Sequence, residues 1–185
     1  MYDSSDLQYV PSAAKKTRQT LINTALPLFL THGYNGIGIN QILKTAKLSK
    51  GAFYHHFSSK IELYEEAVSP FFLDPVEQLD LEQMQHLPLK EIRKLLSIHY
   101  SNMPNHISKN SNIDMTRYLA SYFEAQSLLP SLKASLEAHY NRLIELIANK
   151  TNQEREIFPK VATAHARNII GALEGQFLLD ALVKK

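Results

Sequence analysis

The chain has 185 residues, 44% of them hydrophobic, so it can bury a core as one domain or as a small domain beside a larger one. It has no cysteine, no run of about 18 apolar residues and no signal-peptide pattern at its start, which excludes disulfides and thiolate metal sites and favours a cytoplasmic protein. The net charge of +2 is unevenly divided: residues 1–60 hold seven Lys and Arg against two acids, and residues 61–185 hold thirteen against sixteen. A basic first part favours contact with phosphates, and a random fluctuation of surface charge is the alternative.

The first predicted helix follows an arm or tail of residues 1–14 that has no apolar period. Apolar residues recur at helical spacing from Lys15 to His32, and Gly33 can take the left-handed conformation that ends a helix. Pro27 lies inside this segment, and we expect it to remove one backbone donor and to kink the last turns.

Two short helices are expected next, separated by a tight break at Lys47-Leu48. Ser49 can cap the second of them, which carries Phe53 and leads to Phe57. Ser58 or Ser59 can cap a further helix with Glu62 in its first turn, and its apolar stripe ends near residues 70–75.

The rest of the chain shows no strand pattern and several helical periods, at about 88–103, 113–127, 130–150 and 159–183. Residues 102–112 are expected to form a loop or short helix, and residues 151–156 a surface connection. The fold class is therefore all-α, with about nine helices in two expected domains, residues 1–73 and residues 74–185.

The stretch from residue 39 to residue 60 meets the requirements of a helix-turn-helix, in which the exposed start of the second helix enters the major groove of DNA. Gly51 and Ala52 are small enough to let the backbone approach the bases, and a helix N-terminus attracts phosphate. Tyr54 and His55 can donate to phosphates or base edges, and Lys60 adds positive charge.

The sequence HGYNGIGINQILKTAKLSKGAFYHHFSSKIELY resembles the DNA-binding domain of TetR/AcrR-type bacterial repressors over about residues 15–70, most specifically from Ser49 to Phe57 with Lys60. The resemblance implies a homodimer that reads a near-palindromic operator on double-stranded DNA and releases it when a small molecule enters the C-terminal domain. By position, it implies that DNA is contacted by Thr17, Arg18, Ser49, Lys50, Gly51, Ala52, Tyr54, His55 and Lys60.

The chain departs from the family pattern at three places in this region, of which the first is Pro27, an unusual residue in the first helix. Gly38 stands where the family has a Ser or Thr that caps the helix, so one cap and one phosphate contact are expected to be missing. Lys47 replaces a turn glycine, where a left-handed conformation costs an ordinary residue roughly 1 kcal/mol.

Other kinds of site receive little support from the sequence. His55 and His56 are adjacent and would point about 100° apart on a helix, so they cannot chelate one metal ion together. Gly36-x-Gly38 lacks the preceding strand and the following Lys of a nucleotide loop, and a turn is expected there. No acid, base and nucleophile converge, so we predict no enzyme, cofactor or metal site.

The last predicted helix has almost no polar face between residues 169 and 182, which requires cover on every side. Pairing with a second copy would supply it, and the family resemblance implies the same use of the last two helices, whereas an ordinary core helix is the alternative. The predicted dimer interface consists of Leu132, Leu136, Leu143, Ile147, Ile170, Leu173, Phe177 and Ala181.

Aromatic and polar residues on the central helices could line an apolar cavity with a few polar tips, although such stripes also occur in ordinary cores. The candidate ligand-binding residues are His99, Tyr100, Met103, Tyr118, Tyr122 and Phe123. The leading function is a repressor that a small-molecule effector releases from its operator. A ligand-independent DNA-binding or architectural protein is the alternative, and a helical enzyme is a weaker one.

Overall fold

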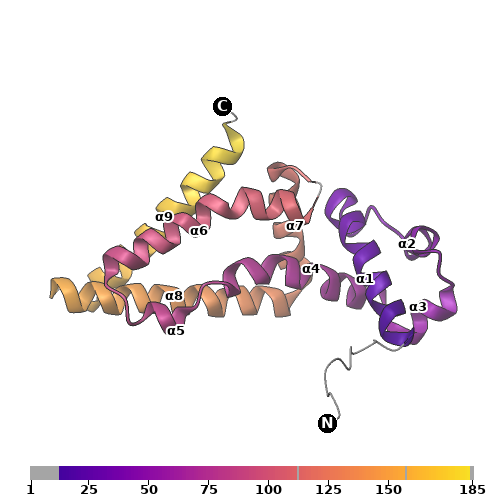
Figure 1. Cartoon of the computed structure of the whole chain (residues 1–185), viewed down its shortest axis with the longest axis horizontal. Coiled ribbons are helices and arrows are strands. Elements are labelled where there is room, and N and C mark those ends of the chain that lie inside the picture. The colour runs from indigo at the N-terminus through magenta and orange to yellow at the C-terminus, as the bar shows by residue number, and fades with distance from the viewer. Residues whose placement is uncertain (1–12, 112, 157, 184–185) are drawn as a thin grey trace, which may run out of the picture. The chain divides into compact units, whose positions relative to one another are not determined.

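The computed structural model describes residues 13–111, 113–156 and 158–183, and over these residues the chain is all-α, with nine helices and no strand (Figure 1). The chain divides into two compact units between Ala67 and Val68. This division and the predicted boundary after residue 73 both lie within α4 (Lys60–Glu77). None of the described helices is long and apolar enough to cross a membrane.

Unit 1 begins with α1 (Ala13–His32), which ends where the sequence predicts. Gly33 has φ 77°, and its N–H donates to the carbonyl oxygen of Phe29 over 2.8 Å. Gly36 follows in a tight turn, where a Cβ atom would lie 2.1 Å from the backbone oxygen of His32. Only glycine fits this turn without a shift of the backbone, and no nucleotide loop is present.

The helix-turn-helix consists of α2 (Ile39–Ala46) and α3 (Lys50–His56). Lys47 stands in the left-handed conformation at φ 56° and ψ 41°, which confirms the predicted strain at this position. Its N–H donates to the carbonyl oxygens of Leu43 and Lys44, so the turn closes α2 as a glycine would. Gly38 has extended dihedral angles and supplies no side-chain cap, as expected.

The core of unit 1 is largely aromatic. The ring of Phe29 meets Tyr64 edge-on at 4.9 Å between centroids, and Tyr34 lies 5.0 Å from Tyr64. Phe53 and Phe57 lie 5.8 Å apart and are both almost fully buried. The contact of Phe29 with Tyr64 joins α1 to α4, and Phe53 and Phe57 bury the inner side of α3, because each buried aromatic residue contributes a large contact area.

Unit 2 contains the end of α4 and five further helices: α5 (Leu81–Met84), α6 (Leu89–Asn110), α7 (Met115–Leu128), α8 (Pro130–Arg155) and α9 (Pro159–Leu182). Asp80 caps the single turn of α5 by accepting the N–H of Gln83 over 3.0 Å. α9 packs against both α8 and α6 (Figure 1). The core between these helices is formed by Met84, Leu89, Ile92, Leu96, Leu143, Ile147, Ala148, Ala162, Ala166, Ile169 and Ile170.

Two predicted ends in unit 2 are wrong. α6 continues through Pro104 to Asn110, because Ile107 extends its apolar stripe and is buried. α8 continues to Arg155 where a surface connection was predicted. Thr151 is fully buried and donates from Oγ1 to the carbonyl oxygen of Ile147 over 2.7 Å, and the helix ends only at Glu156, which has φ 50°.

Candidate nucleic-acid interface and a cavity in the second unit

Helix α3 is held by its cap and by one buried ring. Ser49 is extended, at φ −84° and ψ 161°, and its Oγ accepts the N–H of Ala52 over 3.1 Å. Phe53 is fully buried beneath the helix. The cap satisfies one of the free N–H groups at the helix start, and the others face outward with the positive end of the helix dipole.

The outer face of α3 carries the residues predicted to contact DNA. Lys50, Gly51 and His55 are exposed, Ala52 is half-buried, and Tyr54 is 58% exposed although its ring touches Phe53 edge-on. A Cβ atom on Gly51 would meet only the Oγ of Ser49, at 3.7 Å. The fold therefore does not require glycine here, and its small size leaves the backbone open to a close partner.

The electrostatics of unit 1 favour an anionic partner. Residues 13–61 contain seven Lys and Arg residues and no acidic residue. The next acidic residue along the chain is Glu62. Its Oε2 accepts hydrogen bonds from the N–H and from the hydroxyl of Ser58, each over 2.6 Å. These two hydrogen bonds lower the pKa of Glu62, so this carboxylate serves as a cap at the start of α4.

Three predicted DNA contacts are engaged inside unit 1. Arg18 forms an ion pair with Glu66, and its guanidinium lies 5.1 Å from the ring centroid of Phe57. Lys60 places its ammonium 4.0 Å from the ring centroid of Tyr34. The hydroxyl of Thr17 donates to the carbonyl oxygen of Ala13 over 3.1 Å. Arg18 and Lys60 therefore also hold the unit together, a role that sequence reasoning missed.

The adjacent rings of His55 and His56 meet edge-on at 4.8 Å between centroids. His55 is exposed and His56 is half-buried beside the buried Phe57. Over the described part of the chain, no group of three or more His, Asp or Glu residues could hold a metal ion.

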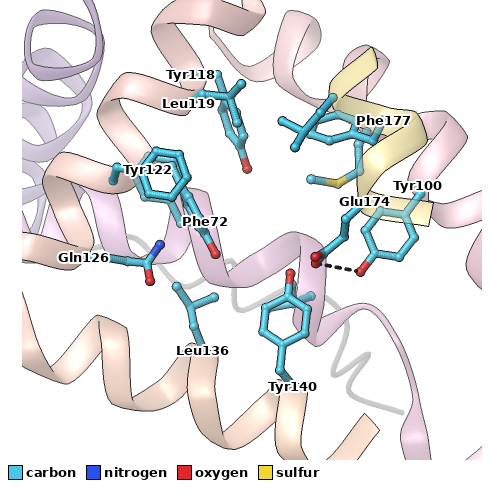
Figure 2. A pocket seen from close by; sticks show the side chains of 14 residues that line it. Phe72, Tyr100, Tyr118, Leu119, Tyr122, Gln126, Leu136, Tyr140, Glu174 and Phe177 are labelled. Atoms are coloured by element: carbon cyan, nitrogen blue, oxygen red, sulfur yellow. Dashed lines mark hydrogen bonds between the residues drawn. The ribbon is translucent and has the colours of Figure 1, made fainter. Parts of the chain in front are cut away.

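A cavity of about 360 Å³ lies within unit 2, among α4, α6, α7, α8 and α9 (Figure 2). Its volume falls in the lower part of the range of about 300–1,000 Å³ that small-molecule sites occupy. Fourteen residues line it: Phe72, Val76, Tyr100, Met103, Tyr118, Leu119, Tyr122, Phe123, Gln126, Leu136, Tyr140, Glu174, Phe177 and Leu178. Five of the six predicted ligand residues are among them, and His99 is not.

Three polar groups of this cavity lie together at one place. The hydroxyl of Tyr100 donates to Oε1 of Glu174 over 3.3 Å, and the hydroxyl of Tyr140 points toward the same carboxylate (Figure 2). Burial, and then the neighbouring carboxylate of Glu174, raise the pKa of Tyr100. Burial, and then Tyr100 and Glu174, raise the pKa of Tyr140. Both phenols are therefore neutral hydrogen-bond donors at neutral pH.

Sequence reasoning missed several residues of the cavity. Glu174 is one of two acids, with Asp180, in the largely apolar stretch of residues 169–182, and an acid in such a stretch was the available signal. Tyr140 lies one turn after Leu136 on the apolar side of α8. Phe72 was read only as part of the apolar end of α4, because no local pattern shows that its ring reaches a cavity.

The residues predicted for a dimer interface are mostly covered within one chain. Leu132, Leu136, Leu143, Ile147 and Ile170 are buried in unit 2, and Leu173 and Phe177 are half-buried, whereas the side chain of Ala181 lies outside the described residues. Buried side chains add no area to a contact with a second copy. The exposed apolar residues of α9 are instead Val161, Leu178 and Leu179.

Comparison with known proteins agrees with the geometry of unit 1. The family described as bacterial regulatory proteins, tetR family, matches residues 21–67. The probable acrEF/envCD operon repressor of Escherichia coli K12 is 32% identical over 87 residues, which are 46% of this chain and 40% of that protein. The chain thus spans less than half of the length of the first curated relatives it matches.

Solved structures show the same fold over both units. A TetR-family transcriptional regulator from Cytophaga hutchinsonii has a TM-score of 0.65 at 22% identity, covering 95% of this chain and 88% of that one. AibR in complex with isovaleryl coenzyme A and operator DNA has a TM-score of 0.60 at 19% identity, covering 91% of this chain and 88% of that one. Residues 21–67 therefore carry the N-terminal helix-turn-helix domain of the tetR family, and both units share the fold of solved TetR-family regulators.

Proposed function

We propose that the chain is a sequence-specific DNA-binding repressor that a small-molecule effector releases from its operator. The observation that carries this proposal is the exposed N-terminal face of α3, capped by Ser49 and set in a segment of 49 residues without an acid. The matched repressor of Escherichia coli supports the same function. Residues 1–73 form the DNA-binding domain and residues 74–185 the sensing domain of a cytoplasmic protein.

The start of α3 enters the major groove, where Lys50, Tyr54 and His55 contact phosphates and base edges. Gly51 and Ala52 permit close approach of the backbone. Lys47 is exposed in the turn before α3 and adds a phosphate contact that the family resemblance did not imply. Arg18 and Lys60 contribute indirectly, by fixing α1 and α4 around α3.

A second copy of the chain pairs along the exposed faces of α8 and α9, so that two copies of α3 read the two halves of an inverted repeat. The apolar exposed residues of α9 support this, because Leu179 is 56% exposed and Val161 54% exposed. Gly171 is exposed and Gly175 is half-buried, and a Cβ atom at either position would meet nothing within 4 Å, so both would admit a close helix contact.

The cavity of unit 2 receives the effector, as the solved complex of AibR with isovaleryl coenzyme A and operator DNA suggests for a protein of this fold. α4 begins with Lys60 in unit 1 and carries Phe72 of the cavity in unit 2. A ligand that binds more tightly when α4 is in one position than in another shifts the chain toward that position. The affinity of unit 1 for DNA can then change by at most the ratio of the ligand's affinities for the two positions. No catalytic role is proposed for the chain.

The test is selection of bound sequences from a random DNA pool, followed by titration of the selected sequence at several salt concentrations. An inverted repeat, with half-sites about one or two helical turns apart and a steep loss of affinity with salt, is expected. The matched control is Tyr54→Ala, which removes an exposed side chain and should enrich the same repeat less strongly than the native protein does. Failure of the native, folded protein to enrich any sequence contradicts the proposal.

A further inference from the structure

The cavity of unit 2 has an unusual balance of charge. Glu174 is the only ionisable acid or base, apart from the tyrosines, among the fourteen described residues that line it, and no Lys, Arg or His lines it. Within the described chain, the carboxylate of Glu174 faces the neutral hydroxyls of Tyr100 and Tyr140 and forms no ion pair. A carboxylate in an apolar cavity without a cation is electrostatically unbalanced, since desolvation disfavours an uncompensated charge.

Seven of the fourteen described residues that line the cavity are aromatic. The ring of Phe72 meets Tyr118 and Tyr122 at centroid distances of 5.5 Å each, and Tyr118 and Tyr122 stack at 6.3 Å. Ring faces attract a cation that lies within about 6 Å of a centroid. Rings therefore supply apolar contact and, together with the carboxylate, stabilise positive charge (Figure 2).

From this geometry we propose that the effector is a lipophilic organic cation, an amine or quaternary ammonium compound whose charged group lies beside Glu174 and whose apolar part fills the aromatic wall. The inference rests on the proposed function for the role of the cavity as an effector site. It excludes acyl carboxylates and phosphate-bearing thioesters, because an anion would meet the carboxylate with no basic side chain in the cavity wall to offset it.

Three probes of similar size separate charge from shape. Phenyltrimethylammonium and tert-butylbenzene share their form and differ in the charge at the quaternary centre, and benzenesulfonate carries the opposite charge. Their affinities are measured by calorimetric titration of the full chain and of two variants. Glu174→Gln removes the charge in the cavity, and Glu137→Gln removes an exposed carboxylate of α8 that pairs with Lys133 at 3.8 Å and does not line the cavity.

The native chain is expected to bind the cation saturably and benzenesulfonate far more weakly. Glu174→Gln should lower the affinity for the cation about tenfold, in the range of a desolvated charge and cation-π contact. It should change the affinity for tert-butylbenzene by less than about twofold. Glu137→Gln should change neither ligand. The inference is overturned if Glu174→Gln lowers the affinities for the cation and for the neutral probe equally, or leaves the affinity for the cation unchanged. It is also overturned if the native chain binds the sulfonate as tightly as the cation, or shows no saturable cation binding at millimolar concentration.

The same preparations are tested for operator enrichment and for thermal unfolding. If an operator sequence is enriched but the cation does not bind, the proposed class of ligand is refuted and the proposed DNA-binding function stands. Cation binding without enrichment refutes the regulator and leaves the ligand class. An unchanged unfolding midpoint of Glu174→Gln in the absence of ligand shows that the variant retains its fold, and a second variant, Glu174→Asp, is expected to keep part of the cation preference because it keeps the charge.

Discussion

The two units of this chain are organised around different kinds of surface. Unit 1 buries Phe29, Phe53, Phe57 and Tyr64 almost completely and presents polar and basic residues on α3, so its chemistry lies on an exposed helix face. Unit 2 contains a cavity of about 360 Å³ that is lined by aromatic side chains and a few polar groups. The comparison indicates that unit 1 is built to hold one rigid face against a large partner, and unit 2 to enclose a small one.

The largest expected effect comes from Phe53→Ala, which removes a fully buried ring beneath α3. We expect the free energy of unfolding of unit 1 to fall by about 3–5 kcal/mol, as for other buried Phe to Ala changes, and DNA binding to be lost. Chemical unfolding followed by circular dichroism measures this loss. Binding of phenyltrimethylammonium in unit 2 should persist, and its loss would break the distinction between the units.

Tyr54→Ala should leave stability within about 0.5 kcal/mol, because the side chain is 58% exposed. Affinity for the selected operator should fall about tenfold, a typical loss for one base or phosphate contact of the recognition helix. Fluorescence anisotropy with labelled operator measures this change. An affinity equal to that of the native protein would show that DNA is contacted elsewhere.

Lys50→Ala should weaken binding to operator and to unrelated DNA alike, because a lysine at the exposed start of α3 contacts phosphate. The slope of log affinity against log salt should decrease by about one. Lys90→Ala provides the control, because Lys90 is exposed at the start of α6 in unit 2. If both variants lower the slope equally, then the basic character of unit 1 has no special role.

Gly38→Ser should stabilise unit 1 by about 0.5–1 kcal/mol, because the serine supplies the missing cap of α2 and reduces the freedom of the unfolded chain. The backbone at Gly38 is extended, and a Cβ atom there meets nothing within 4 Å. Thermal unfolding measures the gain, and Gly38→Ala, which cannot cap, is the control. A gain of equal size in both variants would exclude capping as its cause.

A pH effect is expected in unit 2, because His139 on α8 is 4% exposed and its Nε2 has no hydrogen-bond partner in the described structure. Burial, and then Arg142, lower its pKa below the ordinary 6.5. The unfolded chain therefore takes up a proton at this residue before the folded chain does, and stability falls as the pH drops below about 6.5. His139→Gln should remove this part of the pH dependence, measured by unfolding between pH 5 and pH 8.

Unit 1 was more predictable from the sequence than unit 2 because its signals are local. Gly33, Ser49 and the Ser58–Glu62 cap each act within one turn of their own position, and the structure confirms all three. The contacts that hold α1 to α3 and α4 were missed, since the pairing of Arg18 with Glu66 joins residues 48 positions apart.

In unit 2 the positions of the helices were predictable, and several of their ends were not. Pro104 and the Asn-rich segment indicated a loop, but burial of Ile107 outweighs these local preferences and extends α6. The apolar stripes of α8 and α9 predicted a dimer interface, and most of the residues named for it are buried within one chain, because periodicity alone does not tell whether a stripe faces its own chain or a second copy. The cavity itself depends on how five helices pack, which no local pattern specifies.

The central claim is that occupation of the cavity in unit 2 and DNA binding by unit 1 are linked, and reciprocal titration tests it most directly. The affinity for operator is measured with and without saturating phenyltrimethylammonium, and the affinity for the cation with and without operator. Linkage requires that both affinities decrease by the same factor, about 5-fold to 150-fold for a typical coupling. Equal affinities in the presence and absence of the other partner would contradict the account.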